Sequence, residues 1–355
     1  MCPRFPVDPA AAAAVKCTAR PPFPRRRPAA LPLLICASAT SAGPGKAGPA
    51  GEDAHFLLPP GGGPATSPSA SSVGAPTVGV GVFDGVGGWR RLGIDAGDYA
   101  RALAAGAAAY LAARPGPAGS AVVAGRWSAA EALVSAVDAV SLAGTATAVV
   151  AAVVADTEAA AGGAAKEKLE DGGGGGCGAW ASAHPPPPEG QPRRSGRRLV
   201  GVSIGDSALW VIRAGTVVYR SPSLGQGAFN QPAQLGAGAL DPLADASAID
   251  VPLDVGDTVV VGSDGLFDNV WGETIVSTAT RDEGGGGGGA VAEAARRLHA
   301  AAVDAYSARR YRSPFAVAAR AAGWDYPDAG KPDDVVVVVC RAEASKGDKG
   351  GGTNL

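Results

Sequence analysis

Carboxylates placed at the ends of strand-like apolar runs are the residues most able to do chemistry in this sequence. They are Asp84 with Gly85 after VGVGVF, Asp264 after VVVGS, and Asp333 with Asp334 directly before five valines. An unpaired carboxylate beside buried valines costs several kcal/mol, so each of these acids must be neutralised, paired or bound to a cation.

A metal ion is one way to satisfy these acids. Hard divalent cations such as Mg²⁺ and Mn²⁺ prefer carboxylate, backbone carbonyl and water oxygens, and acids from distant strand ends can converge on one ion. Each D-G or D-D pair taken alone is also explained as a turn at a strand end. Together with the acidic pair Glu52 and Asp53, the set indicates a metal site with oxygen ligands about as readily as a series of turns.

Two further motifs are weaker candidates for a functional site. A dinucleotide-binding G-x-G-x-x-G would need a third glycine at position 84, which is aspartate. The stretch GVSIG around Ser203 matches the nucleophile elbow of serine hydrolases, which requires a helix directly after the serine. Strand-like sequence follows instead, and the partner would have to be His299, inside a helical pattern. A serine hydrolase therefore remains only an alternative.

Composition limits the class of protein. The chain has 355 residues, 46% of them apolar, with 53 Gly and 29 Pro, which indicates a folded core interrupted by low-complexity segments. The net charge of −2 and the lack of a long basic face argue against a nucleic-acid partner. The five cysteines form no C-x-x-C pair and indicate neither a zinc site nor a disulfide framework.

The elements that must position these acids alternate between strands and helices, which predicts an α+β fold. We expect helices over 97–114, from a capping box at Ser128 and Glu131 to about Gly144, and from the glycine run to about residue 311. A last helix has Ser313 as its N-cap residue, followed by Pro314. The uncharged stretch 139–155 is short for a membrane span and fits a helix end followed by a buried strand.

Low-complexity segments set the expected domain limits. Residues 1–45 are basic and poor in acids, as in an organelle transit peptide, although ALPLLICASA also offers a short signal-peptide-like run. A single folded domain would then cover 46–343, with an insertion at about 157–198 and a glycine run at 284–289. Residues 344–355 are expected to be a disordered tail.

A series of motifs makes the prediction specific. GEDAHF, DGVGGW, GDSALWVIRAG, FNQPAQLG, GDTVVVGSDGLFDNVW, SPFAVAARAAG and KPDDVVVVV occur between about residues 50 and 341. Their order resembles that of the metal-dependent, type 2C serine/threonine protein phosphatases, above all the organelle-associated branch that carries D-G-V-G-G-W. The resemblance implies a phosphatase domain with a central sandwich of two antiparallel sheets flanked by helices, in four α-β-β-α layers, with a two-metal site at one end.

The resemblance also implies roles for single residues. The implied ligands of two Mg²⁺ or Mn²⁺ ions are Asp84, Gly85 through its carbonyl, Asp264 and Asp333. Asp334 is an alternative to Asp333, and Glu52 with Asp53 resembles the acidic pair that holds water at the metals. The family's phosphate-binding arginine before this pair is missing, and Lys46, the only basic residue there, is the candidate to bind the substrate phosphate in its place. Ser203 and Asp206 fall in the family's structural G-D-S hairpin, so no covalent nucleophile is expected.

The sequence thus predicts a Mg²⁺- or Mn²⁺-dependent phosphatase that acts on phosphoserine and phosphothreonine in proteins, using a metal-activated water. A catalytically inactive phosphoprotein-binding relative, in which the fold is kept without turnover, is the non-enzymatic alternative. The expected partner is a phosphoprotein substrate, with no nucleic acid and no transmembrane span. The expected location is a chloroplast or a mitochondrion, and the sequence makes no prediction of the oligomeric state.

Overall fold

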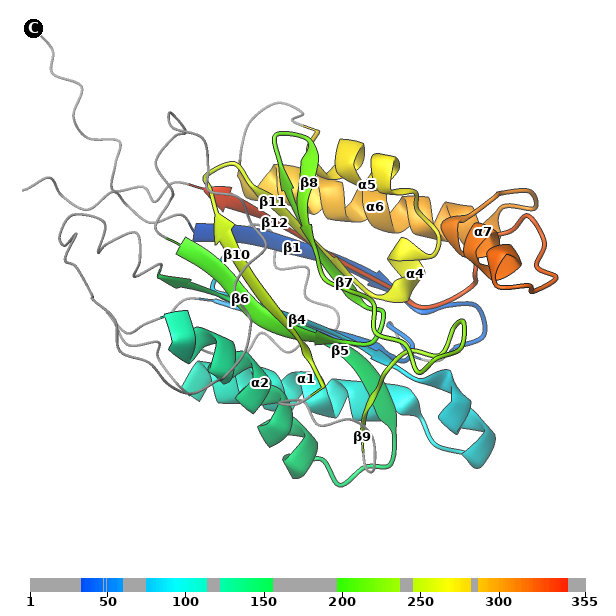
Figure 1. The fold of residues 1–355 in the computed structure, drawn as a ribbon, viewed down its shortest axis with the longest axis horizontal. Coiled ribbons are helices and arrows are strands. Elements are labelled where there is room, and N and C mark those ends of the chain that lie inside the picture. Colours follow the sequence, from blue (N-terminus) through cyan, green and yellow to red (C-terminus); the bar gives the residue numbers. More distant parts are fainter. Residues whose placement is uncertain are drawn as a thin grey trace, which may run out of the picture.

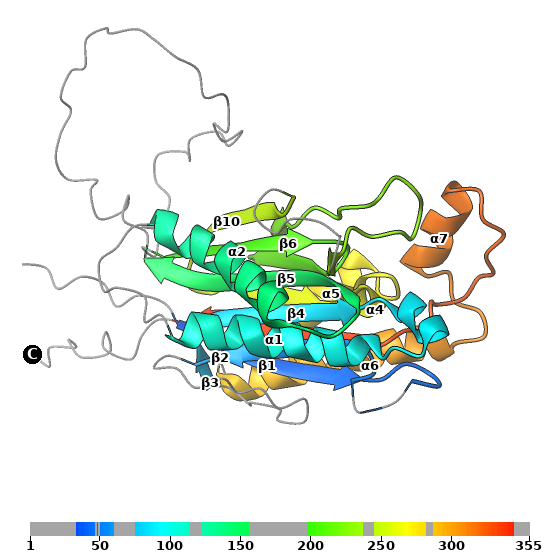
Figure 2. The same ribbon diagram turned by 90° about the horizontal axis from the view of Figure 1, so that it is seen from below.

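The computed structural model describes residues 33–46, 48, 50–59, 75–113, 122–155, 197–236, 245–281 and 287–343. Within these ranges the chain forms two antiparallel β-sheets stacked face to face, with helices on both outer faces (Figure 1). This arrangement confirms the predicted α+β sandwich in four layers. Figure 2 shows the same layers from below, with α1 and α2 lying over the sheet that contains β4, β5 and β6.

The first sheet has six strands and contains the two segments that lead into the predicted acids. Its order is β3 (Ala75–Thr77), β1 (Leu33–Ser41), β12 (Val335–Glu343), β11 (Thr258–Gly262), β7 (Ala208–Arg213) and β8 (Thr216–Arg220). The run of valines in β12 is explained by burial on both faces. Val336 and Val338 pack between the two sheets, whereas Val335, Val337 and Val339 pack under the helices.

The second sheet carries the remaining strands. Its order is β10 (Ser247–Leu253), β6 (Arg197–Ile204), β5 (Thr145–Ala155), β4 (Gly79–Gly85) and β2 (Asp53–Leu58), and the short β9 (Leu235–Gly236) also pairs with β5. Alternation along β4 assigns its faces, because Val80 and Val82 point between the sheets and Phe83 points to the helices. Both strands β2 and β4 therefore bring an acid to the same end of the sandwich.

The helices complete the outer layers. Helices α1 (Ala96–Ala113) and α2 (Val122–Ala139) pack on the second sheet, and α5 (Gly272–Ala279) and α6 (Gly288–Ser307) pack on the first. The short elements are η1 (Gly87–Leu92), α4 (Asp264–Phe267) and α7 (Pro314–Ala321). Among the described residues, no helix has both the length and the apolar character needed to cross a membrane.

Helix starts were predicted with mixed success. Ser313 caps α7 as expected, because its Oγ accepts a hydrogen bond from Ala316 N at 3.0 Å and Pro314 opens the helix. The Ser128 and Glu131 pair does not mark a helix start, because α2 already begins at Val122. A capping-box spacing also occurs by chance inside helices, so it needs a supporting boundary signal.

The N-terminal boundary at residue 45 is wrong. The apolar run that resembled part of a leader forms β1, which lies between β3 and β12 in the first sheet. The folded part of the chain therefore starts by Leu33 at the latest. The expected insertion lies, for residues 156–196, outside the described residues, as do the first residues of the glycine run at 284–286 and the tail 344–355.

The cysteine prediction also needs correction. Cys36 of β1 and Cys340 of β12 stand opposite each other in the strand register and form a disulfide bond. Both side chains are fully buried between the two sheets. The two residues lie 304 positions apart in sequence, so only the pairing of the strands brings them together.

Candidate metal centre

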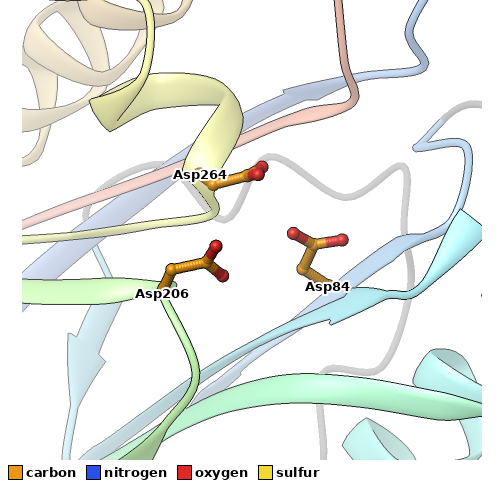
Figure 3. A group of neighbouring side chains, drawn as sticks. All are labelled: Asp84, Asp206 and Asp264. Carbon is orange, nitrogen blue, oxygen red and sulfur yellow. The ribbon is translucent and has the colours of Figure 1, made fainter. Parts of the chain in front are cut away.

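Three aspartates from three separate elements meet at one end of the sandwich. Asp84 lies near the end of β4, Asp206 in the turn between β6 and β7, and Asp264 at the start of α4. One carboxylate oxygen from each lies within 4.8 Å of the others, and Figure 3 shows the three side chains pointing toward a common space. Such convergence of carboxylate oxygens is typical of sites for hard divalent cations.

Strand pairing places the neighbouring acids beside this group. Asp53 of β2 stands opposite Asp84 of β4 in the register, so the two carboxylates share one end of the second sheet. In the first sheet, β11 and β12 are antiparallel neighbours, and Asp264 follows one while Asp333 precedes the other. The antiparallel pairing thus explains why acids after one strand and before another converge.

Glycine at position 265 is required by the close approach of the backbone there. A Cβ atom built on Gly265 would lie within 1.9 Å of the carbonyl oxygen of Asp334. No side chain fits at that distance, so the D-G sequence lets α4 pack directly against the residue before β12. This contact fixes the position of Asp264 relative to the Asp333 and Asp334 pair.

Several carboxylate oxygens in this group have no donor within hydrogen-bonding geometry among the described residues. They include both oxygens of Asp53, Oδ1 of Asp264 and Oδ1 of Asp206, all buried from solvent. An orphaned buried carboxylate is costly, which makes these atoms the feature that best fits a bound cation. The residues present therefore suit the oxygen-liganded metals expected from the sequence.

The electrostatics of the cluster agree with a demand for cations. Burial, followed by the neighbouring carboxylates, raises the pKa of Asp53 and of Asp84 well above the ordinary value. Burial and Asp264 raise the pKa of Asp206 to about 7, and burial raises that of Asp268 to about 6 although Lys331 opposes the rise. Carboxylates this close cannot all ionise at neutral pH without added positive charge.

The charge count makes the imbalance explicit. Among the described residues of the cluster, carboxylates outnumber cationic side chains by eight to three. The carboxylates are Glu52, Asp53, Asp84, Asp206, Asp264, Asp268, Asp333 and Asp334, and the cations are Lys46, Arg90 and Lys331. Divalent cations would offset the remaining negative charge.

Lys331 is a functional candidate that the sequence analysis missed. Its ammonium group contacts Asp264, lies 2.8 Å from Asp268 Oδ2 and 3.5 Å from Asp333 Oδ2. Burial alone would lower the pKa of Lys331, but the three acids raise it well above its ordinary value. It stands two residues before Asp333 in KPDD, so the available signal was a basic residue inside the acid motif.

Asp333 and Asp334 have different surroundings. Asp334 is 1% exposed, and its oxygens accept hydrogen bonds from Gly43 N at 2.6 Å and Glu52 N at 2.7 Å. Asp333 is partly exposed. Burial raises its pKa, but the opposing effect of Lys331 and Lys46 is larger, so the pKa of Asp333 lies below the usual range. Asp334 therefore holds the 43–52 loop in place, whereas Asp333 keeps a charged carboxylate at the cluster.

Lys46, which the sequence analysis assigned to the substrate phosphate, lies inside the acidic cluster. Its Nζ donates hydrogen bonds to Asp333 Oδ1 at 2.7 Å and Asp334 Oδ2 at 2.8 Å, and it lies 2.9 Å from Glu52 Oε2. Burial lowers its pKa, but Asp333 and Asp334 raise it well above the ordinary value. Its charge is thus already matched by carboxylates of the protein.

The serine-hydrolase residues do not come together. Ser203 is fully buried in β6 of the second sheet, where its register partners are Val149 and Ser247. His299 lies on α6, which packs on the first sheet, and its Nε2 is 2.8 Å from Ser41 Oγ. This geometry does not support Ser203 as a nucleophile.

Asp206 is a second candidate that sequence reasoning missed. It was assigned to a structural hairpin because it lies in a G-D-S turn, yet its carboxylate belongs to the three-aspartate group. Asp268, in the same SDGLFDN stretch as Asp264, was also overlooked. The available signal was an acid in a turn next to an apolar strand. It had been used for only some of the turns that carry such an acid.

No protein-family model matches the chain. The chain is 28% identical over 314 residues to "Probable protein phosphatase 2C 55" of Arabidopsis thaliana, which covers 88% of this chain and 52% of the relative. It is 28% identical over 313 residues to "Protein phosphatase PTC7 homolog fig" of Drosophila virilis, covering 82% of this chain and 78% of the relative.

A rice relative, "Probable protein phosphatase 2C BIPP2C1" of the japonica subspecies, is 30% identical over 311 residues. These residues make up 87% of this chain and 42% of that relative. The chain thus spans about half the length of the plant relatives it matches along most of its own length.

Solved structures agree with this picture. The photosystem II phosphatase PBCP has a TM-score of 0.63 and 25% identity, covering 88% of this chain and 100% of that one. The catalytic domain of the serine/threonine protein phosphatase PstP, solved with two manganese ions, has a TM-score of 0.50 at 18% identity. It covers 88% of this chain and 99% of that one, and its likeness concerns the fold.

Proposed function

Because the chain belongs to the type 2C, metal-dependent serine/threonine protein phosphatases, we propose that it hydrolyses phosphoserine and phosphothreonine in proteins. The observation that carries the proposal is the group of buried carboxylates with orphaned oxygens at one end of the sandwich. The names of the relatives supply the substrate class, and the acid cluster supplies the chemistry.

The residues that would hold two Mg²⁺ or Mn²⁺ ions are Asp84, the carbonyl of Gly85, Asp264 and Asp333, with Asp206 added from the three-aspartate group. Glu52 and Asp53 would accept hydrogen bonds from water in the site. When bound, such ions polarise the phosphoryl oxygens and lower the pKa of an attacking water molecule. Asp334 is assigned to the loop rather than to a metal, because backbone N–H groups occupy both of its oxygens.

The chain's own side chains would prepare the site in two ways. Lys331 holds the carboxylates of Asp264 and Asp268 in fixed orientations through its ammonium contacts. Asp334 fixes the loop that carries Glu52 by accepting its backbone N–H. No side chain acts as a covalent nucleophile in this proposal, so water attacks the phosphorus directly and no phosphoenzyme accumulates.

A direct test compares the protein with Mn²⁺, with Mg²⁺ and with a chelator on a phosphothreonine peptide. Release of phosphate should require metal and return when metal is added back. Asp84→Asn should weaken Mn²⁺ binding, measured by calorimetry, by about 10- to 100-fold or more. Losses of this size follow even the removal of groups that only hydrogen-bond to a metal ligand, and Asp84 is a proposed ligand. Asp98→Asn, on the exposed surface of α1, is the matched control and should bind Mn²⁺ normally.

The non-enzymatic alternative is separated by the same assay. A pseudophosphatase would bind the phosphopeptide and Mn²⁺ without releasing phosphate. The acids of the cluster favour the enzyme, because a binding protein would have little need to retain so many carboxylates that destabilise the metal-free fold. Phosphate release that survives exhaustive chelation would contradict the proposed metal mechanism.

We further propose that the chain belongs to the organelle-associated branch and that the residues before β1 deliver it to a chloroplast or a mitochondrion. The support is their basic, acid-poor composition and the likeness to a photosystem II phosphatase. A fluorescent reporter fused to residues 1–32 should enter an organelle. A shortened chain that starts at Leu33 should stay outside the organelle yet fold, because β1 is intact in it. Cytosolic fluorescence of the reporter would contradict the proposal.

A further inference from the structure

The positive charge of Lys46 is already paired with carboxylates, so the 43–52 loop offers the proposed phosphatase site no free cation. Three carboxylates lie within 2.9 Å of its Nζ, and its side chain is 16% exposed. A phosphate dianion approaching Lys46 would therefore meet the acids as well as the ammonium group. Like-charge repulsion at this distance opposes binding there.

Arg90 offers the free donors that Lys46 lacks. It lies in η1, six residues after Asp84, and its Nε and Nη2 approach the same oxygen, Oε1 of Glu52, at 3.2 and 3.1 Å. Its side chain is 49% exposed, and no contact within the described residues involves Nη1. A guanidinium group carries five N–H donors, so about three remain available beside the acidic cluster.

The segment around Arg90 is held in place by other contacts. Trp89 donates from Nε1 to Thr145 Oγ1 at 2.8 Å, and Gly93 N donates to Arg90 O at 3.0 Å at the end of η1. Gly93 has φ of 75°, the left-handed conformation that ends the turn. The backbone of Arg90 is thus fixed beside the cluster while its guanidinium remains accessible.

Two glycines precede Trp89 and Arg90 in the segment that follows the D-G pair. A Cβ atom at Gly87 would lie 3.1 Å from Glu52 Oε2, whereas one at Gly88 would have no atom within 4 Å. Glycine at position 87 therefore avoids crowding the Glu52 carboxylate that holds Arg90, and position 88 faces open space.

We propose that Arg90 binds the phosphate group of the substrate, and that Lys46 is an internal counter-cation of the acidic cluster. The inference rests on the proposed phosphatase function. A planar guanidinium can donate two parallel hydrogen bonds to a phosphate, which gives both binding strength and orientation. Glu52 holds the near side of Arg90 and directs its remaining donors away from the carboxylate.

Arg91 provides a matched control for the test. It is the next residue of η1, it is exposed, and no contact of its side chain is found within the described part of the chain. Arg91→Ala changes the net charge by the same amount as Arg90→Ala. A general loss of positive charge near the site would affect both variants, whereas a specific phosphate contact affects Arg90 alone.

The experiment measures kcat and KM on a phosphothreonine peptide, and inhibition by inorganic phosphate, for wild type, Arg90→Ala, Arg90→Lys, Arg91→Ala and Lys46→Ala. Arg90→Ala should raise KM and the inhibition constant of phosphate by about 10- to 100-fold, as expected for losing hydrogen bonds to a charged group. Arg90→Lys should recover part of the loss, and Arg91→Ala should match wild type. Lys46→Ala should instead lower the melting temperature.

Two binding measurements keep the outcomes separate. The Mn²⁺ affinity of Arg90→Ala should stay close to that of wild type, because Arg90 holds no metal ligand in this proposal. Calorimetric binding of inorganic phosphate to the Mn²⁺-loaded protein tests Arg90 without turnover. Weaker phosphate binding in Arg90→Ala, in a chain without phosphatase activity, would support the inference and refute the proposed function. Normal KM and phosphate affinity in an active Arg90→Ala variant would overturn the inference alone.

Discussion

Replacing Asp333 and Asp334 one at a time should separate metal binding from folding. Asp334→Ala removes the acceptor of the buried N–H groups of Gly43 and Glu52. Each unsatisfied buried donor costs about 1–3 kcal/mol, so the loss of both bonds should lower the free energy of unfolding by about 2–6 kcal/mol. The melting temperature should then drop by roughly 4–24 °C, at about 2–4 °C per kcal/mol for a domain of this size.

Asp333→Ala should affect metal binding more than stability. The carboxylate of Asp333 is 21% exposed, and both lysines that contact it keep other acidic partners when it is removed. Lys46 retains Asp334 and Glu52, and Lys331 retains its remaining acids. Only one backbone N–H group, that of Asp334, loses its acceptor, so the free energy of unfolding of the metal-free protein should fall by about 1–2 kcal/mol, less than for Asp334→Ala. Its Mn²⁺ affinity should fall, because Asp333 is the proposed ligand.

Thermal melts in chelator and calorimetric titration with Mn²⁺ provide the two measurements for each variant. An Asp334→Ala variant that melts like wild type would contradict the assignment of Asp334 to the loop. An Asp333→Ala variant that binds Mn²⁺ normally while losing as much stability as Asp334→Ala would contradict the assignment of Asp333 to the metal. Asp98→Asn, at an exposed position of α1, sets the baseline for both assays.

Three further predictions follow from buried polar groups. Asp53→Asn should raise the melting temperature in chelator, because it removes a buried carboxylate with orphaned oxygens, and should abolish stabilisation by Mn²⁺; an unchanged metal response would contradict its role. Ser203→Ala should leave phosphate release intact, and its loss in a folded variant would revive the hydrolase alternative. Burial lowers the pKa of His299, so the unfolded state binds the extra proton and stability falls as pH drops below about 6.5. His299→Gln should flatten this dependence in thermal melts between pH 7.5 and 5.5.

The sequence predicted those features of the fold that depend on local pattern. The five valines before Cys340 indicated a buried strand, and burial of β12 on both faces explains why they do not alternate with polar residues. Ser313 with Pro314 indicated the start of α7 for a local reason, the side-chain cap. The acids at strand ends were also visible locally, because carboxylates seldom follow such runs without a partner.

Features that depend on long-range pairing could not be predicted in this way. The disulfide between Cys36 and Cys340 requires the register of β1 against β12, which no local pattern contains. The same pairing turns a leader-like run into a core strand. The acidic surroundings of Lys46 could not be predicted for a related reason, because two of the three carboxylates around it come from residues 333 and 334. Its neighbours along the chain carried no sign of them.

The distribution of the two lysines shows where the demand for cations is greatest. Lys46 and Lys331 contact Asp333, Asp334 and Asp268, and Lys331 reaches one oxygen of Asp264. No lysine contact to Asp53 or Asp84 is found within the described ranges.

The second oxygen of Asp264 and one oxygen of Asp206 also lack a donor among the described residues. The protein thus neutralises the side of the cluster next to β12 with its own cations. On the side formed by β2, β4 and the β6–β7 turn, no lysine or arginine contact to Asp53, Asp84 or Asp206 is found among the described residues, and burial raises the pKa of these three acids. Divalent ions bound at Asp84, Asp206 and Asp264 would supply charge where the chain does not, so metal binding should stabilise this end of the sandwich as well as activate it.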